Sequence, residues 1–433
     1  MIQASIITIG DELLIGQVVD TNSAWMAQEL NKAGIPVIRR VAVGDEWSKI
    51  WNALDEESKH AQIILITGGL GPTGDDITKP LLCEYFNGKL IVNEEALANV
   101  KYIFERVLNR PMIESNLKQA EVPDTCKVIQ NKRGTAPGMW FEKKYQQPST
   151  EWKDLHEVFD SKQIFVSMPG VPFEMKGMME EYVIPELSKL FELPHIVHRT
   201  LLTAGVGESY LAEQIKDFES ALPKHIKLAY LPNYGMVRLR LSTIGFDKNF
   251  IEKEIEHQFE TLQSLVKDYL VTNEDEPMEV VVGKLLVSKN KTLCTAESCT
   301  GGYIAHLLTA NPGASAYYDG SVVSYSYGAK EHLLQVDHST LQTKGAVSEE
   351  VVIQMAKGAL NNIKSDYVIA VSGIMGPDGG LPDKPVGTVW VAVGNNENII
   401  AQKLYFRFDR MRNIQLTATN ALNMLRKFIL ANG

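Results

Sequence analysis

The feature that most constrains this chain is a repeated pairing of a short apolar strand with a glycine-containing loop. Residues 4–8, 62–67, 292–296 and 366–371 form mostly apolar stretches, and each runs into such a loop. Segments with helical periodicity separate them. This alternation predicts an α/β protein, with a parallel sheet covered by helices on both faces in the first part of the chain. Ligands in such folds bind beyond the carboxyl ends of the strands, where the loops lie.

Composition limits the class of protein. The 433 residues predict two to three domains at roughly 150 residues each. No apolar run approaches the roughly 20 residues of a membrane span, and the first residues lack a signal-peptide pattern, so we expect a cytoplasmic protein without a membrane partner. A net charge of -10 argues against nucleic acid as a partner. The four cysteines lack zinc spacing and fit reduced thiols: Cys83, Cys126, Cys294 and Cys299.

Two loops near the N-terminus combine glycines with acids. Thr21 or Asn22 is expected to cap a helix over 23–32 that follows the first loop. In the second loop, backbone N–H groups of four glycines can form an anion nest, beside the hydroxyls of Thr73 and Thr78: Gly68, Gly69, Gly71 and Gly74. Four acids beside the nest would repel a bare phosphate and so imply a divalent cation: Asp11, Glu12, Asp75 and Asp76. The simpler interpretation is a pair of solvated turns.

The stretch 292–302 places a serine and a cysteine where a strand is followed by a helix. We expect that helix to begin near residues 299–302, so that free N–H groups at its start can receive negative charge. Ser298 is then a nucleophile with oxyanion donors nearby, or simply the helix N-cap. Cys299 is the rival nucleophile, because a thiol at a helix N-terminus has a lowered pKa.

A serine nucleophile needs a base, and no histidine lies in these loops. Lys330 is expected to begin a short helix after a strand over 321–326, which carries Tyr325 near its end. A lysine can serve as base if burial lowers its pKa. Tyr325 can relay a proton or hold Lys330. A surface lysine and a core tyrosine are the simpler interpretations.

The middle of the chain predicts a small α+β domain. Strands are expected over 198–204, 226–231 and 237–242, and a helix over 249–266. No G-x-x-G loop with basic flanks is present, so we interpret Arg238 and Arg240 as surface or interface charges.

Several motifs together resemble the CinA family. They are Gly-Asp-Glu-Leu-Leu at 10–14, Asp-Thr-Asn at 20–22, Thr-Gly-Gly-Leu-Gly-Pro-Thr at 67–73, Gly-Thr-Ala-Pro-Gly at 134–138, Met-Pro-Gly-Val-Pro at 168–172, Ala-Glu-Ser-Cys-Thr-Gly-Gly at 296–302, Pro-Gly-Ala-Ser at 312–315, Gly-Ile-x-Gly-Pro-x-Gly-Gly at 373–380 and Pro-Val-Gly-Thr-Val at 385–389. The resemblance implies a three-layer α/β domain similar to molybdopterin-binding proteins (1–173), a KH-like linker domain (174–265) and a C-terminal α/β domain (278–433).

For the first domain, the resemblance implies hydrolysis of ADP-ribose with a divalent metal, Mg, Mn or Co, with K as a further candidate. The implied ADP-ribose site comprises Gly10, Asp11, Glu12, Asn22, Gly68, Gly69, Gly71, Thr73, Thr78, Gly134, Pro169 and Gly170, and the metal ligands are Asp11, Glu12, Asp75 and Asp76. The alternative is a protein that binds a pterin phosphate without catalysis. A polar insertion from Lys144 to Lys162 departs from the family pattern, where a short hairpin is expected.

For the last domain, the resemblance implies a nicotinamide mononucleotide deamidase of NAD salvage, needing no cofactor. Ser298 is the implied nucleophile, with Lys330 and Tyr325 completing the centre. The expected mononucleotide contacts are Cys299, Thr300, Gly301, Gly302, Gly373, Gly376, Gly379, Gly380, Arg410 and Arg412. Met375, Asp378 and Phe408 depart from the family pattern. We also expect a homodimer, and a competence- or damage-linked interaction protein remains a third possibility.

Overall fold

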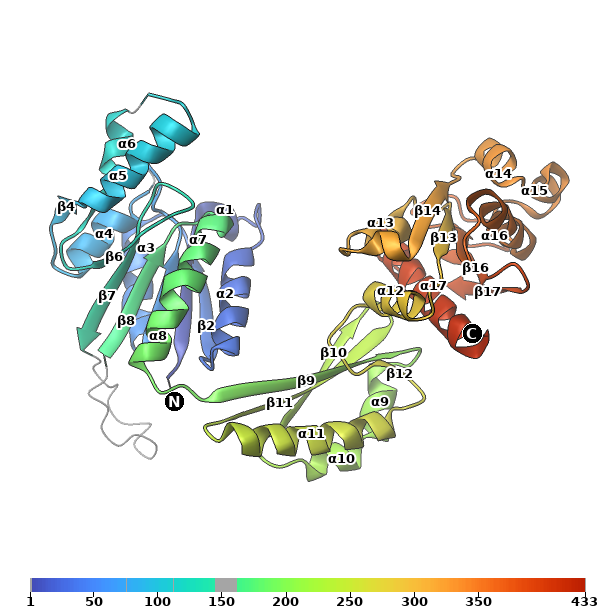
Figure 1. The fold of residues 1–433 in the computed structure, drawn as a ribbon, viewed down its shortest axis with the longest axis horizontal. Coiled ribbons are helices and arrows are strands. Elements are labelled where there is room, and N and C mark those ends of the chain that lie inside the picture. Colours follow the sequence, from blue (N-terminus) through green and yellow to red (C-terminus); the bar gives the residue numbers. More distant parts are fainter. Residues whose placement is uncertain (1, 75, 112, 145–161, 433) are drawn as a thin grey trace. The chain divides into compact units, whose positions relative to one another are not determined.

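The computed structural model describes residues 2–74, 76–111, 113–144 and 162–432 (Figure 1). Contacts divide the chain into two compact units, Met1–Val197 with Ile244–Ile251, and His198–Thr243 with Glu252–Gly433. The insertion at 145–161 and Asp75 lie outside the described residues.

The first unit is built on a six-stranded sheet. Its strand order is β2 (Val37–Val43), β1 (Ala4–Ile9), β3 (Ile63–Thr67), β8 (Lys162–Met168), β7 (Gly138–Lys144) and β6 (Lys127–Ile129). The first four strands are parallel, as predicted, whereas β7 and β6 add an antiparallel edge. Lys144 pairs with Lys162, so the insertion joins the ends of an antiparallel pair.

Helices cover both faces of this sheet. Met26 of α2 (Thr21–Lys32) and Met175 of α7 (Pro172–Met178) pack in one core with Ile6 and Leu65, beside α8 (Ile184–Leu190). On the other face, α3 (Trp47–Ser58) and α4 (Thr78–Tyr85) pack against Ile64 and Phe165. The remaining elements are α1 (Asp11–Leu14), β4 (Leu90–Val92), α5 (Glu94–Tyr102), α6 (Glu114–Lys118), β5 (Glu121–Pro123) and π-helical turns at Ile103–Val107 and Met179–Val183. The predicted three-layer arrangement is confirmed.

One helix start in this unit differs from the prediction. Asp20 caps α2, because its Oδ1 accepts the Ser23 N–H at 2.9 Å. Thr21 and Asn22, the predicted caps, are the first two residues of the helix. A carboxylate and an amide are both good caps, so the choice depends on the chain path rather than on residue type.

The second unit begins with the middle domain. Its sheet has the order β10 (Lys227–Asn233), β11 (Met236–Gly245), β9 (His195–Ala204) and β12 (Leu270–Thr272), accompanied by α9 (Glu208–Gln214), α10 (Lys216–Ala221) and α11 (Lys248–Leu265). The short strand β12 was not predicted. Arg238 Nε donates to the exposed Asp275 within the chain at 3.0 Å, whereas Arg240 Nε is buried and has no hydrogen-bond partner among the described residues, so Arg240 is not simply a surface charge.

The C-terminal domain has a five-stranded sheet with the order β14 (Tyr318–Val323), β13 (Leu293–Glu297), β15 (Tyr367–Gly373), β16 (Thr388–Gly394) and β17 (Ile399–Tyr405). The first three strands are parallel and the last two antiparallel. Its helices are α12 (Met278–Ser288), α13 (Tyr303–Thr309), α14 (Tyr327–Leu334), α15 (His338–Lys344), α16 (Glu349–Ile363) and α17 (Arg410–Asn432), with a 3-10 turn at Ala314–Ala316.

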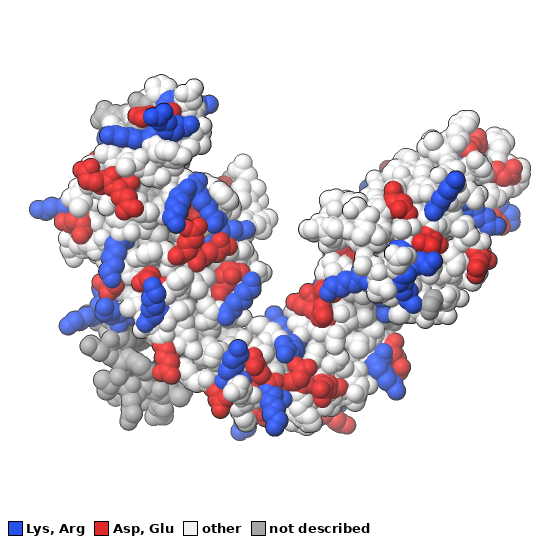
Figure 2. Space-filling view, viewed as in Figure 1, with Lys and Arg blue, Asp and Glu red and all other residues white. Residues whose placement is uncertain are grey.

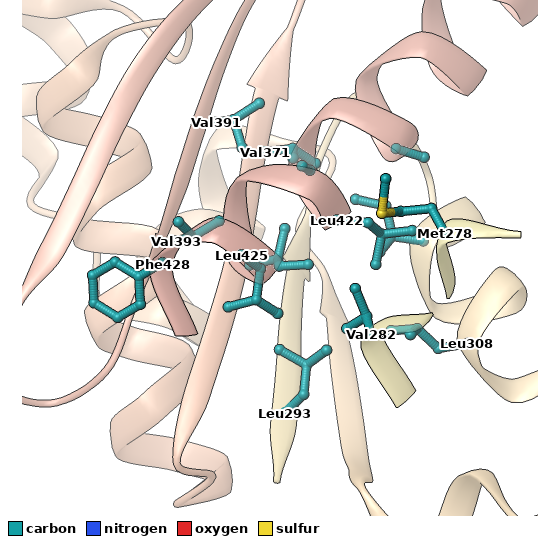
Figure 3. Packing of buried hydrophobic residues seen from close by; sticks show 14 of the residues in the cluster. Met278, Val282, Leu293, Leu308, Val371, Val391, Val393, Leu422, Leu425 and Phe428 are labelled. Carbon is teal, nitrogen blue, oxygen red and sulfur yellow. The ribbon is translucent and has the colours of Figure 1, made fainter. Parts of the chain in front are cut away.

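Two cores enclose this second sheet. Figure 3 shows Met278 and Val282 of α12 and Leu422 and Leu425 of α17 packed against strand residues such as Val391. Leu202, Ala204 and Met236 of the middle domain belong to the same buried cluster. The opposite face packs against α16. Burial on both faces explains why the three central strands, β13, β15 and β16, are mostly apolar, and it fixes the loops at their ends.

Surface charge does not gather by sign. Lys and Arg side chains are interspersed with Asp and Glu over the face in Figure 2, and the described residues there form no continuous basic surface. Among the described residues, no helix is long and apolar enough to cross a membrane.

Candidate active site

A five-residue turn, Ser298–Gly302, joins β13 to α13. The helix begins at Tyr303 with Gly302 as N-cap, so Ser298 is not the cap and the helix starts later than predicted. Gly301 and Gly302 have φ angles of 61° and 95°. Only glycine takes this left-handed region without strain, which accounts for the glycine pair.

The N–H groups at the start of α13 are already occupied. The Glu297 carboxylate, 0% exposed, accepts the N–H groups of Gly302 at 3.0 Å, Ile304 at 3.1 Å and Ala305 at 2.8 Å. The expectation of free donors for an anion at this helix is therefore wrong. Thr300, expected in the mononucleotide site, donates its hydroxyl to Glu297 at 2.7 Å. Sequence reasoning missed Glu297, although an acid at the last position of a buried strand was a usable signal.

Ser298 lies against Lys330. Lys330 Nζ donates to Ser298 Oγ at 2.8 Å and to the Ser324 carbonyl at 2.6 Å. Lys330 is 0% exposed and sits inside α14, which Ser326 caps, rather than at the helix start. Burial lowers the pKa of Lys330 to about 8. A lysine with this pKa carries a substantial uncharged fraction near neutral pH and can accept a proton from the serine.

Cys299 has the opposite surroundings. It is 5% exposed and belongs to the apolar core beneath the sheet. Burial raises the pKa of its thiol to about 12. The lowered pKa expected from a helix N-terminus is therefore wrong, because Glu297 occupies that terminus and burial disfavours the thiolate. The geometry favours Ser298 over Cys299 as nucleophile.

Ser298 and Cys299 both line a cavity of about 190 Å³. Its lining is Ser298, Cys299, Tyr325, Lys330, Ala346, Val347, Ser372, Gly373, Met375 and Arg410. Ala346 and Val347, from the loop before α16, were not predicted; nothing in their residue types marks them. Ser372, also not predicted as a site residue, lies near the end of β15 just before the glycine-rich loop, which was a usable signal.

Arg410 and Tyr325 meet at this cavity. Arg410 Nη2 donates to the Tyr325 hydroxyl at 3.0 Å, and Nη1 donates to the Gly376 carbonyl at 2.7 Å. Tyr325 is 63% exposed and follows β14, so it is neither a core residue nor part of the strand. Its hydroxyl faces Arg410, whereas only its carbonyl, at 3.4 Å, accepts from Lys330.

Other predicted mononucleotide contacts lie outside the cavity lining. They are Thr300, Gly301, Gly302, Gly376, Gly379, Gly380 and Arg412. The Arg412 guanidinium lies 4.2 Å from the centre of the Phe408 ring. This cation–π contact is possible because the chain departs from the family pattern at Phe408. Roles for these residues in binding stay predictions.

The loops of the first unit that were predicted to face one crevice meet where β1, β3 and β8 end. Asn22 Nδ2 donates to the Gly170 carbonyl at 2.7 Å, and Thr67 Oγ1 donates to the Pro169 carbonyl at 2.9 Å. A Cβ on Gly68 would lie 2.2 Å from the Ile9 carbonyl oxygen, so the loop packs tightly on the end of β1. The loops do meet at one edge of the sheet, as the parallel topology predicts.

In these loops, the chain itself fills part of the expected anion nest. Asp76 accepts the N–H groups of Gly71 at 2.7 Å and Thr73 at 2.9 Å. Asp11 exchanges hydrogen bonds with Asp45, its N–H donating at 3.0 Å and its carboxylate accepting at 3.3 Å. Gly134 packs against the Glu174 carboxyl group. Asn131 Nδ2 donates a hydrogen bond to the same group at 2.7 Å.

Two polar atoms at this edge have no partner among the described residues. Asn22 Oδ1 and Thr78 Oγ1 are both buried without a hydrogen bond. Buried polar atoms are rarely left unpaired, so these two suit a ligand or water. The described residues contain no group of three or more His, Cys, Asp or Glu placed to hold a metal ion.

These features define a three-domain α/β protein whose last domain carries a buried Ser–Lys pair. Family models match along the chain in order: a probable molybdopterin binding domain (5–189), a damage-inducible protein CinA KH domain (198–272) and a CinA C-terminal domain (275–429). The chain belongs to the CinA family.

Relatives support this assignment over the full length. A CinA-like protein from Cytophaga hutchinsonii is 44% identical over 98% of both chains, and one from Flavobacterium psychrophilum is 43% identical over 99% of both. Among solved structures, a competence-damaged protein (CinA) superfamily protein from Klebsiella pneumoniae is 36% identical, with a TM-score of 0.35, over 36% of this chain and 96% of that one.

Proposed function

We propose that the C-terminal domain deamidates nicotinamide mononucleotide to nicotinate mononucleotide and ammonia. The observation that carries the proposal is the 2.8 Å contact between Lys330 Nζ and Ser298 Oγ in buried surroundings. Burial supplies the uncharged amine that a serine nucleophile needs when no histidine is near.

The chemistry follows from these two side chains. Uncharged Lys330 takes the proton of Ser298 as the oxygen attacks the carboxamide carbon, and returns it to the nitrogen that leaves as ammonia. Water then attacks the acyl-serine ester and gives one proton to Lys330. Lys330 returns that proton to Ser298 Oγ as the ester C–O bond breaks, and the product leaves as a carboxylate after releasing the second water proton to solvent. Arg410, beside the cavity, is the proposed contact for the substrate phosphate.

The test is ammonia release from nicotinamide mononucleotide by the full-length protein. Ser298→Ala should abolish it, whereas the matched neighbour Cys299→Ala should retain most of it. The reverse pattern would make Cys299 the nucleophile, and a wild-type protein that releases no ammonia would remove the function.

We also propose that the first domain hydrolyses ADP-ribose to AMP and ribose 5-phosphate with a divalent metal. The specific support is the pair of buried oxygens without partners among the described residues, Asn22 Oδ1 and Thr78 Oγ1, at an edge that also carries Asp11 and the glycine loop. Full-length protein given ADP-ribose with Mg, Mn or Co should form AMP. Binding of ADP-ribose or a pterin phosphate without AMP under any of these metals would favour the binding-protein alternative.

The predicted homodimer stays a prediction. Light scattering at micromolar concentration tests it, and a monomer would contradict it.

A further inference from the structure

A buried carboxylate lies under the turn that carries the nucleophile. Glu297 is the last residue of β13 and directly precedes Ser298. Besides the N–H groups of Gly302, Ile304 and Ala305, it accepts the Thr300 hydroxyl. One side chain therefore ties the end of the strand to the whole turn and to the first residues of α13.

The hydrogen bonds of the Glu297 side chain add to those by which the sheet holds the same strand. Glu297 pairs with Val371 of β15 and Val323 of β14, and the Ser298 N–H donates to the Val371 carbonyl at 3.1 Å. The sheet thus fixes the turn where it begins, and the Glu297 side chain fixes it where it ends. Between these two anchors the direction of Ser298 Oγ is set.

Lys330 is held by a second segment. The Ser324 carbonyl accepts from its Nζ, and the Ser326 cap begins its helix. The two segments meet at Glu297, whose carbonyl accepts the Ser324 N–H at 2.8 Å. The 2.8 Å contact between nucleophile and base depends on both segments being placed accurately. A shift of about 1 Å in such a pair costs on the order of 100-fold in rate.

The negative charge of Glu297 lets its carboxylate accept the hydrogen bonds that position the turn. A buried carboxylate is costly unless donors surround it, and here five donors do, the fifth being the Thr295 hydroxyl at 3.4 Å. A glutamine would offer one oxygen and turn its NH₂ toward N–H donors. An apolar residue would leave all of those donors unpaired.

We propose that Glu297 is a positioning residue: its carboxylate holds the Ser298–Gly302 turn so that Ser298 Oγ stays within reach of Lys330 Nζ. The inference rests on the proposed deamidation for its functional consequence. Glu297 takes no proton from the substrate, because it is fully buried and does not line the cavity.

The test is Glu297→Gln in the full-length protein. We expect kcat for ammonia release to fall about 10- to 100-fold, because the nucleophile is misplaced. KM should stay within about twofold, because Arg410 and the cavity walls are unchanged. The rate at which a fluorophosphonate probe labels Ser298 should fall with kcat, which separates misplacement from lost substrate binding.

Glu57→Gln is the matched control. Glu57 is also a buried glutamate, 1% exposed, and its carboxylate accepts from Ser5 and from Arg39 in the first unit. This change should lower thermal stability while leaving kcat and the labelling rate of Ser298 unchanged.

A folded Glu297→Gln protein with wild-type kcat and labelling rate would overturn the inference. If that variant does not fold, Glu297→Asp decides, since it keeps the charge but shortens the reach; normal kcat and labelling would again overturn it. If the wild type releases no ammonia, the proposed function fails, and the labelling rates still decide the role of Glu297.

Discussion

The two candidate sites of this chain are built in different ways. In the C-terminal domain, Lys330 Nζ already lies 2.8 Å from Ser298 Oγ, and both groups are buried. In the first domain, the Asp76 carboxylate is bonded to N–H groups of its own loop, and two oxygens, Asn22 Oδ1 and Thr78 Oγ1, lack a partner in the described part of the chain.

The difference follows from what each proposed reaction takes from the protein. A serine and an amine supply nucleophile and base from the chain itself, so the fold can assemble them in advance. In a metal-assisted cleavage of a diphosphate, the substrate supplies several of the ligands of the metal ion. The protein then needs to provide only a few oxygen ligands and a binding surface at the edge of its sheet.

The largest effect that would sharpen this comparison is a separation of the two activities. Ser298→Ala should lower ammonia release by about 10³-fold or more and leave AMP formation from ADP-ribose unchanged. Chelation with EDTA should do the opposite, because only the first domain's reaction is proposed to use a metal. Both products can be measured on one preparation. Loss of both activities in either experiment would show that the two regions do not work independently.

Arg410→Ala should give the next largest effect. Removing the guanidinium should raise KM for nicotinamide mononucleotide about tenfold or more, because a phosphate contact is lost. Steady-state kinetics of ammonia release measure it. The matched control is Arg412→Ala, whose guanidinium stacks on Phe408 outside the cavity lining and should matter less. An unchanged KM for Arg410→Ala would remove the phosphate assignment.

The pH dependence of deamidation should reflect the protonation state of Lys330, the proposed base. Lys330 must be uncharged to accept a proton, and its pKa is lowered to about 8. The value of kcat/KM should therefore rise with pH and level off above that pKa, with about a tenfold gain between pH 7 and the plateau. A profile that is flat from pH 6 to 10 would contradict Lys330 as the base.

The smallest effect concerns stability. The pKa of Lys330 is about 8 in the folded chain against an ordinary lysine value of 10.5, so the unfolded chain binds more protons between these values. Stability of the wild type should then rise, relative to Lys330→Met, as pH goes from about 8 to about 10.5. Thermal unfolding at several pH values measures the difference.

Lys79→Met provides the matched control in the first unit. Burial also lowers the pKa of Lys79 to about 8, and its Nζ donates to the Gln119 carbonyl at 2.9 Å. The stability of the wild type relative to Lys79→Met should show the same trend with pH, and Lys79→Met should lose no ammonia release. No pH dependence in the Lys330 comparison would mean that its amine is not desolvated.

Much of the architecture was predictable because it is local. The predicted strands over 62–67 and 366–371 are mostly apolar runs, and sheets buried on both faces produce that pattern. Ser348 caps α16 with its hydroxyl, which accepts the Val351 N–H, and serine is a residue type that favours this position. Boundaries near the site were less accurate: α13 begins at Tyr303 because a glycine pair and Glu297 extend the turn beyond Ser298.

The sequence by itself determined the order of strands and helices, the family and the loops at which chemistry is expected, because periodicity, glycine positions and motif spacing are properties of neighbouring residues. Tertiary structure alone decided three matters: that the side chain of Lys330 contacts Ser298 while that of Tyr325 meets Arg410, that Cys299 is buried with a raised thiol pKa, and that Glu297 fills the helix start. Each depends on groups that distant parts of the chain bring together, or on desolvation by the surrounding core, and neither can be read from adjacent residues.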